Sequence, residues 1–123
     1  NAEEIAAANK KIVELIRAKI PETKVLLLAI FPRGANKDRQ TGVVTEAALA
    51  RAAKQMEIIN GANAIIAKLD DGKNVRFLDI GPAFHGQDGK IPFSIMPDQL
   101  HPNAAGYQLW ADAMKPLLEE MLK

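Results

Sequence analysis

KVLLLAIF, residues 24–31, is a short apolar run that lies between Pro21 and Pro32. The run is too short for a typical helix, and it fits a strand that is covered on both faces, as in a parallel sheet. VRFLDI, residues 75–80, follows a DDG turn and has the same apolar character. The sequence therefore predicts two buried strands separated by a long connection.

The segment before the first strand has the pattern of a capped helix. Asn1 is suited to the N-cap position, and Glu4 stands three residues later, which is close to a capping box. Apolar residues recur on one face of this helix: Ile5, Ala8, Ile12 and Leu15. Pro21 then marks the end of the helix.

Two further helices are predicted after the first strand. Residues 32–44 form a predicted loop, and Thr45 caps a long helical stretch in which Gly61 predicts a kink or break. Residues 81–97 form a second predicted loop, and the last helix begins near Asn103. The order helix, strand, helix, strand, helix is typical of a doubly wound α/β fold. Two strands alone do not make a stable parallel sheet, so we expect the chain to be part of a larger α/β domain.

The composition is that of one ordinary globular domain. The 123 residues suffice for a single core, 48% of them are apolar, and the net charge at pH 7 is +1. This balanced charge gives no reason to expect a nucleic-acid partner. No apolar run approaches the ~20 residues of a membrane span and no signal-peptide pattern opens the chain, so we expect a soluble protein of unknown compartment. The absence of cysteine excludes disulfides, a thiolate nucleophile and zinc–thiolate sites.

Asp98 and His101 stand three positions apart, immediately before Pro102 and the last predicted helix. In doubly wound folds, ligands bind beyond the carboxyl ends of the strands, and the loops 32–44 and 79–101 leave from those ends. We therefore expect the pair at the functional edge of the sheet. The two residues alone leave three interpretations open: a catalytic pair, a surface or helix-capping histidine, and two ligands of a metal site without a third ligand.

The sequence DQLHPNAAGYQLWADAM, residues 98–114, resembles the last block of the SGNH or GDSL hydrolases, in which an Asp-x-x-His pair supplies two members of a Ser-His-Asp triad. VLLLAIFPRG, residues 25–34, and VRFLDIGPAF, residues 75–84, are similar to the subgroup of platelet-activating-factor acetylhydrolase-like proteins and bacterial carbohydrate acetylesterases. The resemblance covers essentially the whole chain. It implies a three-layer α/β/α flavodoxin-like fold, of which this chain supplies the C-terminal part with about two parallel strands and three or more helices.

The resemblance also implies roles for the two residues. His101 would be the general base that takes the proton of the nucleophile, and Asp98 would orient the imidazole and stabilise the imidazolium. The family's Gly-Asp-Ser block and the glycine and asparagine of its oxyanion hole are not in this chain. Residues 1–123 are therefore expected to be the C-terminal portion of one domain, completed by an N-terminal segment or a second polypeptide that carries the nucleophilic serine.

Other polar residues lie near the predicted functional edge. Ser94 is the only serine, and it lacks the glycine-flanked turn of a nucleophile, so we expect it to form loop hydrogen bonds. Arg33 is a candidate for substrate binding, although a salt bridge that anchors its loop explains it as well. His85 is expected to be a polar loop residue, and Asp79 a turn residue.

The resulting hypothesis is a serine esterase that hydrolyses a short-chain acyl ester, with an acetyl ester of a carbohydrate as the first choice. A phospholipid acetylhydrolase or lysophospholipase of the same mechanism is one alternative, and a non-catalytic binding or interaction fragment is another. The hypothesis needs no metal and no other cofactor. Its partners are the acyl-ester substrate and the completing segment, and a carbohydrate esterase would favour a secreted or periplasmic location.

Overall fold

The two predicted strands form, and they lie side by side in parallel. In the computed structural model, which describes residues 1–123, β1 (Val25–Leu28) pairs with β2 (Val75–Leu78) in a two-stranded sheet. The register places Val25 opposite Val75. Both strands are shorter than the apolar runs that predict them.

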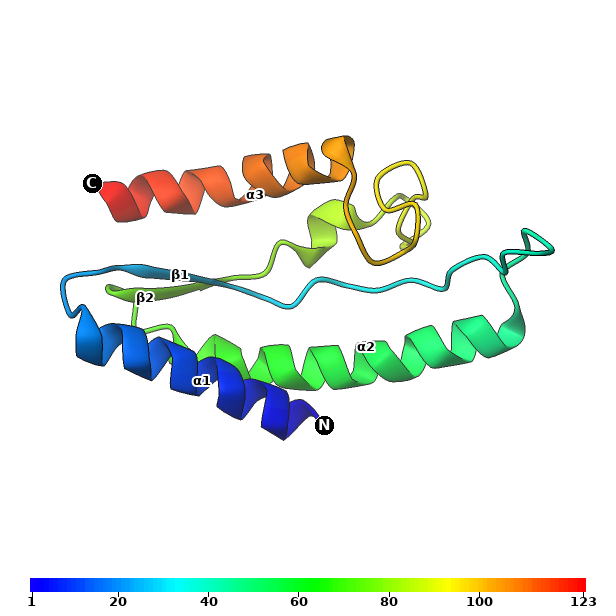
Figure 1. Ribbon diagram of the computed structural model, residues 1–123. Helices are drawn as coiled ribbons and strands as arrows, with labels where there is room; N and C mark the ends of the chain where they lie inside the picture. The colour runs from blue at the N-terminus through cyan, green and yellow to red at the C-terminus, as the bar shows by residue number, and fades with distance from the viewer.

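Helices cover the sheet on two sides, which gives three layers (Figure 1). α1 (Ala2–Lys19) and α2 (Glu46–Ile66) pack against each other on one side of the sheet, and α3 (Ala104–Leu122) lies on the other. α2 connects β1 to β2 and continues into a short 3₁₀ helix, η1 (Ala67–Leu69). The predicted α/β class is therefore confirmed. None of the three helices combines the length and the apolar character that a membrane span requires.

Each α-helix begins at the residue that its sequence predicts. The Asn1 side chain accepts a hydrogen bond from the Glu4 N–H at 2.9 Å, and the terminal ammonium donates to the Glu4 carboxylate at 3.0 Å, which completes the capping box. Thr45 and Asn103 cap α2 and α3 in the same way, through a side-chain oxygen. These caps satisfy N–H groups that a helix leaves unpaired in its first turn.

α2 runs through Gly61 without the break that this glycine predicts. A Cβ atom built at Gly61 would lie 3.0 Å from the Cβ atom of Ala2 in α1. The absence of a side chain lets the two helices approach each other closely. Helix packing therefore explains this glycine, and the predicted break is wrong.

The structure buries a different face of α1 from the apolar face that the sequence predicts. Ala6 and Val13 are buried, whereas Ile12 and Leu15 are 57% and 48% exposed. α1 thus has apolar side chains on two sides, and its neighbours in the fold cover only one of them.

Asn63 of α2 holds the chain where β1 ends. Its side-chain oxygen accepts a hydrogen bond from the Ile30 N–H at 2.8 Å, and its Nδ2 donates to the Ile30 carbonyl at 3.0 Å. Pro32 has no N–H and cannot extend a strand ladder. The end of the apolar run is therefore fixed to α2 instead of continuing the strand.

The main buried cluster lies between the carboxyl ends of the strands and α3. Its four residues are Ile80, Phe84, Ile91 and Met96. Phe84 belongs to a 3₁₀ helix, η2 (Gly81–Phe84), so the prediction of a continuous loop over residues 81–97 is wrong at its start. Trp110 of α3 extends the cluster, with its ring edge-on to Phe31 at a centroid distance of 4.6 Å. The loops that follow the strands therefore rest on a packed base.

Asn63→Ala is expected to lower the free energy of unfolding by about 1–3 kcal/mol, because both backbone groups of Ile30 lose their partner. Asn60→Ala is the matched control, since Asn60 lies exposed on the same helix, and it should change stability by less than about 0.5 kcal/mol. Urea unfolding followed by circular dichroism measures both variants. Equal effects of the two substitutions would contradict the role assigned to Asn63.

Candidate active site

The loops that follow β1 and β2 meet at one end of the molecule. Both strands run in the same direction, so both loops leave from the same edge of the sheet, at the right of Figure 1. The Gly34 N–H in the first loop donates a hydrogen bond to the Gln99 carbonyl in the second at 3.1 Å. This bond connects the segment with Arg33 to the segment with Asp98 and His101.

Asp98 and His101 form a hydrogen-bonded pair in a tight turn. Asp98 Oδ1 accepts hydrogen bonds from the Leu100 N–H at 3.0 Å and from the His101 N–H at 2.7 Å. Asp98 Oδ2 lies 2.6 Å from His101 Nδ1. One carboxylate thus fixes both the backbone of the turn and the ring of His101.

The His101 side chain stabilises the ionised form of Asp98. Its hydrogen bond lowers the pKa of Asp98 from 3.8 to about 2, with further lowering from the backbone N–H groups of His101 and Leu100. An ionised carboxylate has no proton to donate, so the hydrogen in this bond belongs to His101 Nδ1. In the neutral imidazole, Nε2 is then a proton acceptor. The His101 side chain as a whole is 73% exposed.

Gln99, between the two residues, holds the turn in place. Its backbone φ is 60°, in the left-handed region that residues other than glycine rarely adopt. The residue is only 5% exposed. Its Nε2 donates to the carbonyls of Ile91 and Met96 at 3.1 and 3.0 Å. Its own N–H also bonds to the Met96 carbonyl. The residue that separates Asp98 from His101 is therefore anchored to the buried cluster.

Ser94 does not bond to His101. Its carbonyl accepts a hydrogen bond from Asn103 Nδ2 at 2.8 Å, while Asn103 Oδ1 caps α3. Asn103 thus joins the loop to the helix that follows His101. No hydrogen bond connects the Ser94 hydroxyl with the Asp98–His101 pair, so this geometry gives Ser94 no role as nucleophile.

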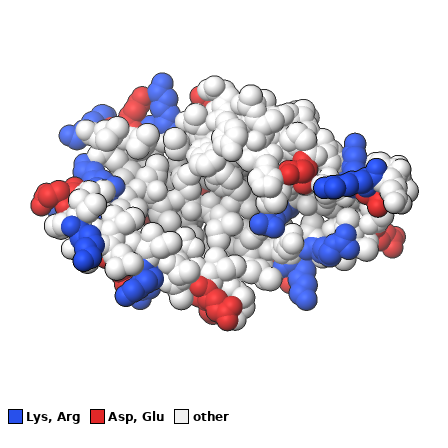
Figure 2. All heavy atoms as spheres, viewed as in Figure 1, with Lys and Arg blue, Asp and Glu red and all other residues white.

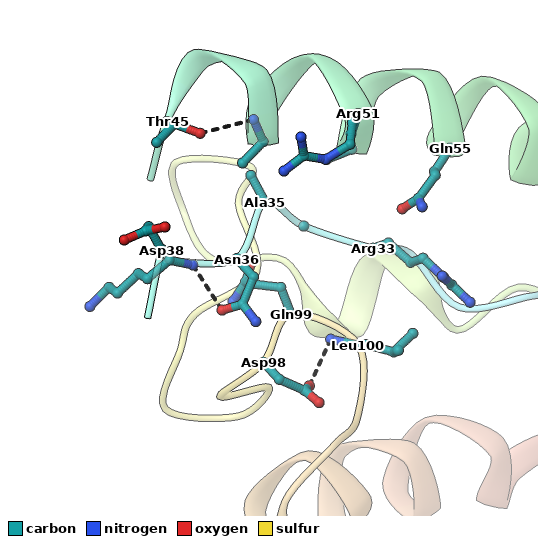
Figure 3. A pocket seen from close by; sticks show the side chains of 14 residues that line it. Arg33, Ala35, Asn36, Asp38, Thr45, Arg51, Gln55, Asp98, Gln99 and Leu100 are labelled. Atoms are coloured by element: carbon teal, nitrogen blue, oxygen red, sulfur yellow. Dashed lines mark hydrogen bonds between the residues drawn. The ribbon is translucent and has the colours of Figure 1, made fainter. Parts of the chain in front are cut away.

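A cavity of about 300 Å³ opens beside Asp98 (Figure 3). Polar side chains predominate in its wall, and Figure 3 shows Arg51 and Gln55 reaching from α2 toward the segment that carries Asn36. Asp98 and Gln99 lie on the far side of that segment. A polar ligand in this cavity would lie next to the Asp98 carboxylate.

A second cavity of about 550 Å³ shares four residues with the first: Arg33, Gly34, Ala35 and Gln99. Apolar side chains provide much of its wall, among them Leu49, Met56, Ile91 and Phe93. The contact between Gly34 and Gln99 therefore stands between a polar cavity and a more apolar one.

The remaining predicted residues have distinct places. Arg33 lines both cavities, and its guanidinium forms no salt bridge or side-chain hydrogen bond, so the predicted anchoring salt bridge is not present. His85 lines the second cavity only. Asp79 accepts the Gly81 N–H at 2.8 Å, which is the turn role that its position predicts.

The sequence gives no signal for two features of this site. Gln99 adopts a backbone conformation that favours glycine, and Arg51 and Gln55 reach the cavity from the middle of a helix.

The Asp98–His101 pair has no third histidine, cysteine or carboxylate beside it that would complete a metal site.

A layered α/β fold with an Asp–His pair beyond the carboxyl ends of parallel strands is an arrangement typical of hydrolase domains. The model of the GDSL-like lipase/acylhydrolase family matches residues 1–109. The chain belongs to this family, and the resemblance found in the sequence is confirmed.

The curated relatives are longer than this chain. It is 29% identical to the human platelet-activating factor acetylhydrolase IB subunit alpha1 and 32% identical to the Gallus gallus subunit alpha2. The alignments cover 98% and 99% of this chain but 46% of each relative. The chain therefore spans about half the length of the curated relatives it matches.

Two solved structures share the fold. One is described as a platelet activating factor from Streptococcus pneumonia, with a TM-score of 0.71 and 23% identity over 96% of this chain and 52% of that one. The other is assigned as an acylhydrolase from Bacteroides fragilis, with a TM-score of 0.66 and 18% identity over 100% of this chain and 54% of that one. The predicted hydrolase fold class is thereby confirmed, with this chain as part of it.

Asp98→Asn should change how stability depends on pH. The folded pKa of Asp98, about 2, lies below its ordinary value of 3.8, so its ionised form stabilises the fold above that value. This contribution is lost as the pH falls from about 4 to about 2. The stability difference between the parent and Asp98→Asn should therefore shrink as the pH falls below about 4.

Urea unfolding at stepped pH measures this difference. Glu57→Gln is the control, because the Glu57 carboxylate is exposed and forms no hydrogen bond or salt bridge. A difference for Asp98→Asn that stays constant down to pH 2 would show that the bond to His101 does not stabilise the ionised carboxylate.

Gly34→Ala should displace Gln99 and loosen the Asp98 turn, because the new Cβ atom would lie 1.9 Å from Gln99 Oε1. The pKa of Asp98, followed by carbon-13 NMR of its carboxyl group, should then rise from about 2 toward 3.8. Gly86→Ala is the control, since its Cβ atom would come no closer than 3.4 Å to any neighbour. An unchanged Asp98 titration in Gly34→Ala would show that the turn does not depend on Gln99.

Proposed function

We propose that this chain is part of a serine ester hydrolase in which Asp98 and His101 are two members of the catalytic triad. The observation that supports the proposal most is the 2.6 Å contact between Asp98 Oδ2 and His101 Nδ1 beyond the carboxyl ends of the strands. Membership of the GDSL-like lipase/acylhydrolase family supports the same chemistry.

The proposed mechanism uses the tautomer that the Asp98 carboxylate imposes. His101 Nε2 takes the proton of the serine hydroxyl as the oxygen attacks the ester carbonyl, and the imidazolium that forms is stabilised by Asp98. The same proton is then given to the leaving alcohol. A water molecule, with His101 again as the base, then attacks the acyl-enzyme, which releases the carboxylic acid and restores the serine.

In this proposal the nucleophile comes from outside residues 1–123. The Ser94 hydroxyl forms no hydrogen bond with His101, and the chain contains no other serine. We therefore propose that residues 1–123 are the C-terminal portion of one domain. An N-terminal segment, or a second polypeptide, would supply the serine and the oxyanion-hole groups.

The proposed substrate is a short-chain acyl ester of a carbohydrate, with acetyl as the acyl group. The cavity beside Asp98 supports this choice, because Arg51, Gln55 and Asn36 can donate hydrogen bonds to the hydroxyl groups of a sugar. Arg33, at the boundary of the two cavities, is the proposed contact for a substrate oxygen. A carbohydrate esterase would act outside the cytoplasm, so we propose a secreted or periplasmic location.

A phospholipid acetylhydrolase or lysophospholipase of the same mechanism is the second candidate. The larger cavity favours it, because Leu49, Met56 and Phe93 offer an apolar wall to an alkyl chain. The curated relatives support it as well, since their names describe platelet-activating factor acetylhydrolase subunits.

His101→Ala in the complete protein should reduce ester hydrolysis by roughly 10⁴- to 10⁶-fold, because the base that activates the serine is lost. Hydrolysis of p-nitrophenyl acetate measures the rate, and His85→Ala is the matched control. Asp98→Asn should reduce the rate less than His101→Ala, and a chelator should have no effect. Activity of His101→Ala within tenfold of the parent would contradict the assignment and favour a non-catalytic role.

The two substrate candidates differ in the leaving group, so competition between substrates separates them. An acetylated xylo-oligosaccharide and an acetylated ether phospholipid are compared by kcat/KM in the complete protein. For a carbohydrate esterase, Arg51→Ala should reduce kcat/KM for the sugar ester and leave p-nitrophenyl acetate hydrolysis nearly unchanged. Preference for the phospholipid, with loss caused by Phe93→Ala, would select the second candidate.

A further inference from the structure

The side chain of Gln99 is buried, and only one half of its amide group is paired. The residue is 5% exposed, and its Nε2 donates to the carbonyls of Ile91 and Met96 at 3.1 and 3.0 Å. Its Oε1 accepts no hydrogen bond from any group in the chain. Polar atoms of buried side chains are nearly always paired, so the unpaired oxygen requires an explanation.

The neighbours of the amide fix the direction of this oxygen. Both partners of Gln99 Nε2 are carbonyl oxygens, which accept hydrogen bonds and cannot donate them. The amide nitrogen must therefore face Ile91 and Met96, and Oε1 must point away from them. On that side Oε1 lies against Gly34, where a Cβ atom would come within 1.9 Å of it. The position of the acceptor is thus set before any ligand binds.

Gln99 Oε1 is accessible from the cavities beside Asp98. The only side-chain polar atoms that are both fully buried and unpaired are Arg76 Nε and Trp110 Nε1. The unpaired Oε1 therefore retains some accessible surface. Gln99 lines the cavity of about 300 Å³ and the cavity of about 550 Å³, and Figure 3 shows it beside Asp98 and Asn36. A ligand in the polar cavity can reach this oxygen.

Gln99 differs from every other polar side chain in the wall of the polar cavity. It is the only one that is buried, whereas the charged side chains of this wall are exposed. At this end of the molecule, on the right of Figure 2, both positive and negative side chains lie at the surface. Exposed groups exchange their hydrogen bonds with water, while a fixed and largely dry acceptor discriminates more strongly between ligands.

We infer that Gln99 Oε1 binds the substrate, by accepting a hydrogen bond from a hydroxyl group next to the acyl ester. The inference rests on the proposed function, in which the ester lies at the Asp98–His101 pair. Because Gln99 separates these two residues in the chain, a group at its Oε1 belongs to the part of the substrate nearest the ester. Arg51 and Gln55 offer donors to that substrate, and Gln99 supplies the fixed acceptor.

This acceptor defines the substrate class more closely. A carbonyl oxygen binds an O–H or N–H group, but it offers nothing to an ether or ester oxygen. A sugar that carries one acyl ester beside a free hydroxyl group satisfies it. A fully acylated sugar and an acetylated choline phospholipid have no such donor, so they would cover Oε1 without pairing it. Gln99 thus favours the carbohydrate ester over the phospholipid.

The test compares matched esters in the complete protein. One is a monoacetate of methyl xyloside whose ester is flanked by free hydroxyl groups, and the other is the analogue in which hydrogen replaces those hydroxyl groups. The kcat/KM for the hydroxyl ester should be at least about tenfold higher. A third ester, with methyl ethers in place of the hydroxyl groups, should behave like the hydrogen analogue, because its oxygens cannot donate.

Two variants assign this preference to Gln99. Gln99→Gly removes Oε1, and glycine adopts the left-handed backbone readily, so the ratio of the two kcat/KM values should fall to within about twofold of one. The ratio cancels any general loss of activity from a looser Asp98 turn, because both esters share that loss. Gln55→Ala is the matched control, since it removes an exposed amide from the same cavity and should preserve the ratio.

Binding to the His101→Ala form, measured by titration calorimetry, separates the inference from the proposed function because it requires no turnover. A Kd at least about tenfold lower for the hydroxyl ester supports the contact, even where no ester is hydrolysed. Hydrolysis without preference for the hydroxyl ester would overturn the contact and leave the function standing. Failure to bind either ester, or a preference that survives in Gln99→Gly or disappears equally in Gln55→Ala, would overturn Gln99 as the acceptor.

Discussion

Parallel pairing of β1 with β2, from Val25 opposite Val75 to Leu28 opposite Leu78, is the constraint on which the candidate site depends. Because the strands run in the same direction, the loops that follow them leave from one edge and can bond to each other. The Gly34–Gln99 hydrogen bond is such a contact between segments far apart in sequence. An antiparallel pair would send these loops to opposite ends and would separate Arg33 from the Asp98–His101 pair.

The strained backbone of Gln99 holds Asp98 in the position where its carboxylate bonds to His101. A left-handed conformation at Gln99 costs of the order of 1–2 kcal/mol, and it persists where surrounding contacts determine it. The hydrogen bonds from Gln99 Nε2 to the carbonyls of Ile91 and Met96 are such contacts. Gly34 leaves the space that the Gln99 side chain needs. With Gln99 fixed, the Asp98 carboxylate reaches both the backbone and the ring of His101. The pair is therefore held in position before any substrate binds.

Features that depend on neighbouring residues were predictable from the sequence, and features that depend on distant residues were not. The caps at Asn1, Thr45 and Asn103 follow from side chains that bond within their own turn, and the strands follow from short apolar runs. The place of Asp98 and His101 at the edge followed from their order after the second strand. The continuous helix at Gly61 and the roles of Asn63 and Gln99 depend on contacts with other elements, which local patterns do not encode.

The Asp98–His101 pair is exposed to solvent, which weakens the attraction between its two side chains. Asp98 owes its low pKa to hydrogen bonds and not to burial, and its side chain is 47% exposed beside a His101 side chain that is 73% exposed. In water, the attraction between a carboxylate and an imidazolium is strongly screened, and it grows as water is excluded. In the proposed complete domain, the segment that supplies the serine would therefore contribute more than a nucleophile. It would also place the pair in a drier environment, where Asp98 stabilises the imidazolium more strongly.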